Sequence, residues 1–252
     1  MKSHETAILI VDDDVDTCRN LSDILTDLGY RVDTANDGPT ALKLVQQRRY
    51  DVALLDLKMP GMDGLTLYRE IKKLRAGTVA IIVTAYASRA VAEEAFTAGA
   101  WKIVPKPIDF PNLVGLVDEA LDQPMVMVVD DDTDLCTNLW DLLHQQGYRV
   151  CIAHDEASAA EQLKEQRFKI VLIDLKLPQG DGTSVLRLVH EANPQARTIL
   201  ITGYRSETEQ IIQRALAEGA DTVCYKPFDM PILLDTMKQL ANPIRDQGSG
   251  PR

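Results

Sequence analysis

The chain has 252 residues, of which 45% are hydrophobic, so it is long enough for two domains of ordinary size. Its formal net charge of −11 argues against a nucleic-acid backbone or an anionic membrane as the main partner. No apolar run approaches membrane-spanning length, the N-terminal segment does not resemble a secretory signal, and the four cysteines lack metal-ligand spacing. We therefore expect a cytoplasmic protein with reduced thiols.

Strand and helix patterns alternate along the first half of the chain. Residues 7–11 (AILIV) form a continuous apolar run, which is typical of a parallel strand covered on both faces. Apolar residues then recur at helical spacing from Cys18 to Leu28, and Gly29 ends that helix. Further strands are expected at residues 30–32, 52–55, 79–83 and 102–104, and further helices at residues 41–45, 65–73, 88–98 and 111–121. This alternation predicts a parallel sheet between two layers of helices.

The chain repeats itself. Residues 54–64 (LLDLKMPGMDG) map to residues 172–182 (LIDLKLPQGDG), an offset of 118 residues. Further along, the offset becomes 120, because two residues are inserted in the second copy between Tyr204 and Gly219. A period of this length indicates a duplicated domain rather than a solenoid.

The repeat defines the domain organisation. We predict one domain over residues 5–122, a second over residues 124–242 and a flexible tail over residues 243–252. The linker between the two domains is very short, so we expect them to touch and to be limited in their relative orientation.

Polar residues follow four of the five predicted strands in each copy. Ligands of parallel α/β sheets sit beyond the carboxyl ends of the strands, so side chains placed there should converge. These residues are Asp12, Asp13, Asp56, Thr84 and Lys106 in the first copy, and Asp130, Asp131, Asp174, Thr202 and Lys226 in the second.

Such a cluster of acids requires cations. At about 4 Å and an effective dielectric constant near 20, each pair of carboxylates repels by roughly 4 kcal/mol. A lysine offsets part of this, and the all-oxygen set suits Mg²⁺ for the rest. We expect Asp56 to be a phosphoryl-accepting nucleophile, with Lys106 and Thr84 binding the phosphoryl oxygens.

The metal ligands follow from the same spacing, with one Mg²⁺ in each domain. They are expected to be Asp12, Asp13, Asp56 and the backbone carbonyl of Lys58 in the first copy, and Asp130, Asp131, Asp174 and the backbone carbonyl of Lys176 in the second.

Other interpretations of the aspartate run remain alongside this one. The run can be a polar loop that only caps a helix, and we expect Asp16 to be a cap. An EF-hand loop is excluded, because its sixth and twelfth places would be Thr17 and Asp23. A haloacid-dehalogenase-type phosphatase is similar in kind. Its motif Asp-x-Asp-x-Thr/Val requires threonine or valine at the fifth place, but counting from Asp12 that place is occupied by Asp16. Buried packing roles are expected for Cys18, Cys136, Trp101 and Trp140.

The motifs ILIVDDD, LLDLKMPGMDG, IIVTA and PKP, followed by VMVVDDD, LIDLKLPQGDG, LITG and YKP, resemble two receiver domains of bacterial two-component response regulators. The resemblance implies two flavodoxin-like (βα)5 domains, each with a five-stranded parallel sheet of order 2-1-3-4-5. It also implies Mg²⁺-dependent phosphoryl transfer from a phosphohistidine to Asp56 or Asp174. Finally, it implies cis peptide bonds before Pro107 and Pro227.

The chain departs from this family at one position in each copy. Receivers usually carry an aromatic residue three positions before the lysine, and its rotation reports phosphorylation. Ile103 and Val223 stand there instead. We therefore expect smaller backbone shifts in the fourth helix and fifth strand, or the neighbouring domain, to carry the signal. Lys58, Tyr86 and their counterparts Lys176 and Tyr204 are expected to shade the phosphoryl group from water.

These observations predict a signalling relay or adaptor rather than an enzyme with a separate substrate. The expected partners are a histidine kinase or a histidine phosphotransfer protein and a downstream protein target, with no direct nucleic-acid or membrane binding. We also expect an intramolecular contact between the two domains, and a homodimer is a candidate assembly. Alternatives are a phosphate sink, a receiver that regulates its twin, and an Mg²⁺-dependent phosphatase that uses an aspartyl-phosphate.

Overall fold

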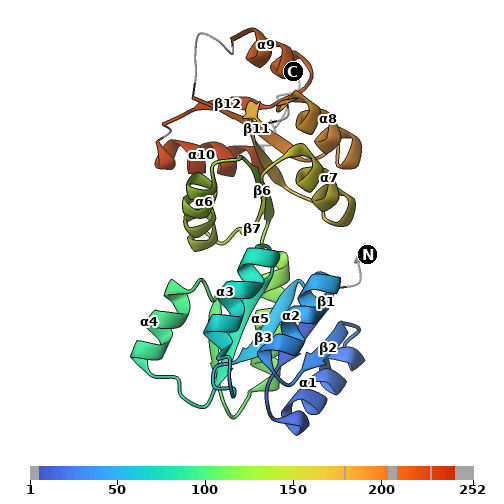
Figure 1. The fold of residues 1–252 in the computed structure, drawn as a ribbon, viewed down its shortest axis with the longest axis vertical. Coiled ribbons are helices and arrows are strands. Elements are labelled where there is room, and N and C mark those ends of the chain that lie inside the picture. The colour runs from blue at the N-terminus through green and yellow to red at the C-terminus, as the bar shows by residue number, and fades with distance from the viewer. Residues whose placement is uncertain (1–5, 179, 204–208, 228, 242–252) are drawn as a thin grey trace, which may run out of the picture. The chain divides into compact units, whose positions relative to one another are not determined.

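The structure is a computed structural model that describes residues 6–178, 180–203, 209–227 and 229–241 (Figure 1). The chain divides into two compact units, Met1–Gln123 and Pro124–Arg252. The predicted tail, residues 243–252, lies outside the described residues.

Strands and helices alternate strictly in the first unit. They are β1 (Ala7–Val11), α1 (Val15–Asp27), β2 (Arg31–Ala35), α2 (Gly38–Gln47), β3 (Val52–Asp56), α3 (Gly64–Leu74), β4 (Val79–Thr84), α4 (Arg89–Thr97), β5 (Lys102–Pro105) and α5 (Phe110–Asp122). The strands pair in parallel in the order β2-β1-β3-β4-β5. The predicted fold and sheet order are therefore confirmed for this unit.

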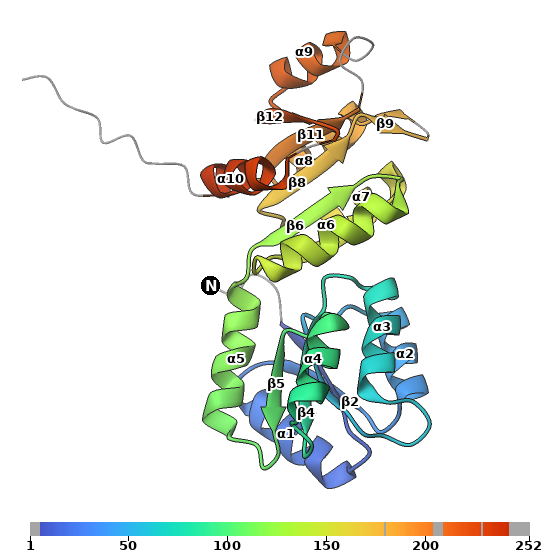
Figure 2. The same cartoon turned by 90° about the vertical axis from the view of Figure 1, so that its left-hand side faces the viewer.

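The second unit repeats this architecture with one addition. Its elements are β6 (Met125–Val129), α6 (Thr133–Gln145), β7 (Arg149–Ala153), α7 (Glu156–Glu165), β8 (Ile170–Asp174), β9 (Lys176–Leu177), β10 (Gly180–Asp181), α8 (Thr183–Ala192), β11 (Arg197–Thr202), α9 (Glu209–Ala217), β12 (Thr222–Tyr225) and α10 (Met230–Ala241). The order β7-β6-β8-β11-β12 again matches the prediction. The short antiparallel hairpin of β9 and β10, which follows β8 (Figure 2), was not predicted.

The continuous apolar run of β1 reflects a strand that is covered on both faces. Successive side chains of a strand point to opposite sides of the sheet. Leu9 and Val11 pack in one core cluster with residues of α2 and α3, whereas Ile8 and Ile10 pack in another with residues of α1 and α5. All five residues of β1 are buried. The sheet therefore lies between two helical layers, and its strand ends are free to carry polar side chains.

The helix that follows β1 begins earlier than the predicted cap implies. The side chain of Asp14 accepts hydrogen bonds from the backbone N–H groups of Asp16 and Thr17, at 2.9 and 3.4 Å. The prediction that Asp16 caps this helix is therefore wrong, because α1 starts at Val15 and Asp16 lies in its first turn. In a run of aspartates the cap is the last residue with extended backbone, which here is Asp14.

Residues expected to serve in packing do so. Cys18, Cys136 and Trp140 are buried, and Trp101 is half-buried against the first unit's core. Burial raises the pKa of the Cys18 thiol to about 11 and that of the Cys136 thiol to about 12. Both thiols are therefore protonated and unreactive at neutral pH.

One buried hydroxyl in the first core has no hydrogen-bond partner among the described residues. Tyr68 of α3 is fully buried, and burial raises its pKa above the ordinary value. Leu186 occupies the equivalent position in the second unit. We expect Tyr68→Phe to raise the free energy of unfolding by about 1 kcal/mol, because it removes an unsatisfied polar atom.

Chemical denaturation of the first unit checks this expectation. Tyr30→Phe is the matched control, because the Tyr30 hydroxyl donates a 2.6 Å hydrogen bond to Asp118. That substitution should cost about 1 kcal/mol. A Tyr68→Phe variant that is destabilised would contradict the prediction.

Candidate functional site

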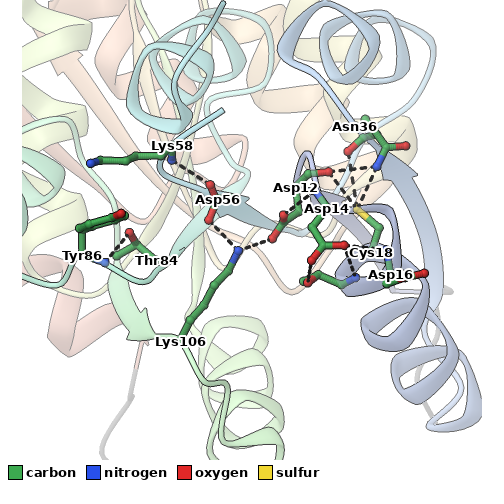
Figure 3. Close-up of polar contacts among 12 residues, drawn as sticks. Asp12, Asp14, Asp16, Cys18, Asn36, Asp56, Lys58, Thr84, Tyr86 and Lys106 are labelled. Carbon is green, nitrogen blue, oxygen red and sulfur yellow. Dashed lines mark hydrogen bonds and ion pairs between the residues drawn. The ribbon is translucent and has the colours of Figure 1, made fainter. Parts of the chain in front are cut away.

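The ammonium group of Lys106 lies between two carboxylates at the carboxyl edge of the first sheet. Its Nζ is 2.7 Å from Oδ2 of Asp12 and 2.8 Å from Oδ1 of Asp56 (Figure 3). Asp12 follows β1, Asp56 ends β3 and Lys106 follows β5. Asp12 and Asp56 are only 3% and 7% exposed. The ends of three separate strands thus bring two buried acids and one base into direct contact.

Backbone N–H groups hold the remaining carboxylate oxygens. Oδ2 of Asp56 accepts from the N–H of Lys58 at 2.8 Å, and Oδ1 of Asp12 accepts from the N–H of Asp14 at 3.0 Å. In each acid, therefore, one carboxylate oxygen contacts the Lys106 ammonium group and the other accepts a hydrogen bond from a backbone N–H group. This arrangement fixes the orientation of both carboxylates before any ligand arrives.

Burial dominates the electrostatics of this trio. It raises the pKa of Asp56 above the ordinary 3.8, and the neighbouring Asp12 adds to the increase, although Lys106 and the Lys58 N–H oppose it. Burial alone would lower the pKa of Lys106, but its hydrogen bonds to Asp12 and Asp56 outweigh burial and raise it above 10.5. With one ammonium group facing two carboxylates, the pocket favours a further cation.

The second unit contains the same arrangement. Nζ of Lys226 is 2.6 Å from Oδ2 of Asp130 and 2.9 Å from Oδ2 of Asp174. Burial raises the pKa of Asp130, and hydrogen bonds to the two acids raise that of Lys226 against the effect of burial. The N–H of Lys176 donates to Asp174 at 3.1 Å, as Lys58 does in the first unit.

Asp13 and Asp131, the exposed acids of the two sites, are placed differently relative to the buried acids. Carboxylate oxygens of Asp130, Asp131 and Asp174 lie within 4.8 Å of one another, close enough to share a metal ion. Among the described residues no such group of three acids forms around Asp56, and Asp13 is exposed. The structure therefore brings together all three predicted acids in the second unit and two of them in the first.

The threonines end the fourth strand of each sheet. Thr84 and Thr202 are buried at the ends of β4 and β11. The hydroxyl oxygen of Thr84 accepts a hydrogen bond from the N–H of Tyr86 at 3.1 Å, so it faces its own loop rather than Lys106 (Figure 3). Nζ of Lys58 lies 3.6 Å from the centre of the Tyr86 ring. Tyr204, the counterpart of Tyr86, lies outside the described residues.

The positions that replace the expected aromatic residue are part of the cores. Ile103 and Val223 are half-buried and pack against the clusters of their own units. The Lys106–Pro107 and Lys226–Pro227 peptide bonds are cis.

Sequence reasoning missed two side chains beside the acids. Asn36 and His154 both contact the backbone carbonyl of the first acid in their unit. Their one shared sequence signal is an N–H donor one residue after the second strand of each sheet, at equivalent positions of the repeat.

The family model of the response regulator receiver domain matches residues 8–118 and again residues 126–238. The chain belongs to the response regulator receiver family. We call the first unit receiver 1 and the second unit receiver 2. Receiver domains are signalling domains of two-component systems, and this chain carries two in tandem.

Relatives found by sequence agree with this assignment. A response regulator receiver protein of Anaeromyxobacter sp. (strain Fw109-5) is 32% identical over 232 residues, 92% of this chain and 94% of that protein. The transcriptional regulatory protein ZraR of Escherichia coli O157:H7 is 39% identical over 130 residues, 52% of this chain but only 29% of that protein. Among solved structures, a CheY-like receiver domain protein from Methanospirillum hungatei matches 47% of this chain and 95% of its own, at 34% identity and a TM-score of 0.46.

One further property concerns membranes. Within the described part of the chain, no helix is both long and apolar enough to cross a bilayer.

Proposed function

We propose that this chain is a phosphoacceptor of a two-component system. Asp56 and Asp174 take a phosphoryl group from the phosphohistidine of a histidine kinase or histidine phosphotransfer protein, and the chain then signals through contacts with a downstream protein. The observation that carries the proposal is the buried acid pair bridged by a lysine, which occurs in both receivers.

The chemistry of the donor set fits Mg²⁺. The set consists of hard oxygen ligands, carries a net negative charge beside one lysine, and groups three carboxylates within 4.8 Å in receiver 2. Bound Mg²⁺ would neutralise charge on the transferred phosphoryl group. The residues that would hold it are Asp12, Asp13, Asp56 and the Lys58 carbonyl in receiver 1, and Asp130, Asp131, Asp174 and the Lys176 carbonyl in receiver 2.

The residues of receiver 1 divide the transfer between them. A carboxylate oxygen of Asp56 attacks the phosphorus, the phosphorus–nitrogen bond of the phosphohistidine breaks, and the imidazole leaves with the electron pair. Lys106, already 2.8 Å from Asp56, stays with the phosphoryl oxygens and stabilises their charge. The Thr84 hydroxyl, which now accepts from the Tyr86 N–H, turns to donate to the phosphoryl group.

Incubation with a small phosphodonor and Mg²⁺ tests the proposal. Intact-protein mass spectrometry should show phosphoryl groups on both receivers of the wild type. Asp56→Asn and Asp174→Asn should each lose one, and the double variant should lose both, because an amide cannot replace the carboxylate nucleophile. Omission of Mg²⁺ should prevent labelling. A wild-type chain that takes up no phosphoryl group would contradict the proposal.

The same experiment distinguishes a receiver from the alternative of an Mg²⁺-dependent phosphatase. A phosphatase releases phosphate over many turnovers, whereas a receiver retains a bond that is stable in acid and labile in base. The phosphate-sink and receiver-on-receiver alternatives predict that removal of one aspartate changes the labelling kinetics of the other. Phosphotransfer profiling of Asp56→Asn and Asp174→Asn against candidate kinases identifies the donor.

Output without the switch aromatic is part of the proposal. With Ile103 packed in the core of receiver 1, backbone shifts in α4 and β5 carry the signal. Nuclear magnetic resonance spectra of that surface should change on phosphorylation, and an unchanged spectrum would contradict this route.

We expect Tyr86→Ala to speed hydrolysis of the phosphoryl group on Asp56 severalfold. Tyr86 is 58% exposed and its ring centre lies 3.6 Å from Nζ of Lys58, and we propose that these two side chains limit the access of water to the phosphoryl group. Tyr86→Phe keeps the ring and should hydrolyse at the wild-type rate. Loss of phosphoprotein over time is the measurement, and equal rates in Tyr86→Ala and the wild type would contradict the prediction.

A further inference from the structure

Two side chains hold the peptide bond that joins the first two acids of receiver 1. The carbonyl oxygen of Asp12 accepts hydrogen bonds from Nδ2 of Asn36 at 3.0 Å and from the thiol of Cys18 at 3.4 Å (Figure 3). The N–H of Asp12 in turn donates to the carbonyl of Ala35 at 3.2 Å. The one S–H hydrogen of Cys18 is shared with the carbonyl oxygen of Ala35, 3.7 Å from the sulfur, whereas the Asn36 amide donates directly to Asp12. The peptide plane from Asp12 to Asp13 is therefore restrained in its rotation.

Receiver 2 makes the same contacts with a different side chain. The carbonyl oxygen of Asp130 lies 3.0 Å from Nδ1 of His154 and accepts from the Cys136 thiol at 3.3 Å. Its N–H donates to the carbonyl of Ala153 at 3.0 Å. Because a carbonyl can only accept, Nδ1 of His154 must carry the hydrogen. An amide and an imidazole thus perform one task at equivalent positions of the repeat.

We propose that Asn36 and His154 are positioning residues of the two metal sites. Each holds the peptide plane that leads into the next acid, Asp13 or Asp131, and so sets where that carboxylate meets the ion. This inference rests on the proposed metal-dependent function. A thiol is a weak donor, so the amide or imidazole supplies the stronger of the two hydrogen bonds.

The exposure of Asn36 and His154 limits how much metal affinity is lost when either side chain is deleted. Groups that orient metal ligands typically contribute about 10- to 100-fold to metal affinity. Asn36 and His154 are exposed, so water can replace a deleted donor, and the thiol contact remains. The loss on deletion should therefore fall at or below the lower limit, about three- to tenfold.

Mn²⁺ binding by the full-length, unphosphorylated chain tests the inference. Asp131→Asn first weakens the site of receiver 2, so that receiver 1 dominates the titration. Free Mn²⁺ is measured by electron paramagnetic resonance at constant pH. In this background Asn36→Ala should weaken binding about three- to tenfold. Asn36→His, which installs the donor of receiver 2, should bind within about twofold of the parent.

The reciprocal set repeats the test on receiver 2. In an Asp13→Asn background, His154→Ala should weaken Mn²⁺ binding and His154→Asn should restore it. The inference is overturned by alanine variants that bind as tightly as their parents, or by exchange variants that bind as weakly as the alanine variants. Unfolding in metal-free buffer identifies a merely structural role, in which stability falls with affinity. A wild-type chain that binds no Mn²⁺ contradicts the proposed function itself.

Discussion

Gly64→Ala is expected to lower the free energy of unfolding of receiver 1 by about 3 kcal/mol and to disable the proposed phosphoacceptor Asp56. A Cβ at Gly64 would lie 2.2 Å from the backbone oxygen of Asp56 and 3.0 Å from its carbonyl carbon. Both are backbone atoms at the end of β3, so no side-chain rotation can relieve the contact. The strand end or the start of α3 must move, and the carboxylate of Asp56 moves with it away from Lys106.

Two other glycines frame this prediction. Gly182→Ala should have the same effect on receiver 2, because its Cβ would lie 2.3 Å from the Asp174 oxygen and its φ is +25°. Gly115 of α5 is exposed, and a Cβ there would extend into open space, so Gly115→Ala should raise stability by about 0.5–1 kcal/mol. Denaturation in a Trp140→Phe background follows receiver 1 through Trp101, and denaturation in a Trp101→Phe background follows receiver 2 through Trp140. A Gly64→Ala chain as stable as the wild type would contradict the prediction.

The accuracy of sequence reasoning about the fold follows the burial of each strand. The central strand β1 is covered on both faces, so its apolar run marks its full extent. β2 lies at the sheet edge, and of Arg31–Ala35 only Ala35 is buried. The apolar pattern therefore predicted a strand at residues 30–32, shorter and earlier than the real one. Strand order came from the family resemblance, since periodicity carries no information about which strands are neighbours.

The functional site, like the fold, can be predicted only in part from the sequence. Spacing along the chain placed the acids and lysines correctly at strand ends, because the carboxyl ends of parallel strands share an edge. It could not predict that Lys58 stacks on Tyr86, which depends on side-chain conformations. Nor did it predict the hairpin of β9 and β10, where the only signal is that the glycine at position 61 of the first copy has shifted to Gly180 in the second.

Lys106→Met should cost receiver 1 about 3 kcal/mol of unfolding free energy at neutral pH without metal. The substitution leaves the buried carboxylates of Asp12 and Asp56 facing each other with no cation between them. Burial already raises the pKa of Asp56, and loss of the ammonium group raises it further. Protonation then removes the repulsion, so the deficit should shrink as the pH falls toward that raised value.

The stability difference between the wild type and Lys106→Met should also change at alkaline pH. The pKa of Lys106 is raised above 10.5 by the two acids, so its stabilising effect is complete below 10.5 and is lost as the pH rises through the raised value. Wild-type and variant stabilities should therefore converge in alkaline solution as well. Denaturation curves of both chains across this range measure the difference, in which the titration of groups that do not contact Lys106 cancels.

Controls separate this loss from a general effect of removing a lysine. Lys43 of α2 is exposed, so Lys43→Met should change stability by no more than about 0.5 kcal/mol. Lys226→Met should reproduce the loss in receiver 2, where Lys226 bridges Asp130 and Asp174. Excess Mg²⁺ should narrow the deficit of Lys106→Met, because an ion among the carboxylates replaces part of the missing charge. A deficit that persists unchanged in Mg²⁺ would mean that the acids of receiver 1 do not bind the ion, whereas no deficit at all would mean that their charge is not balanced by Lys106.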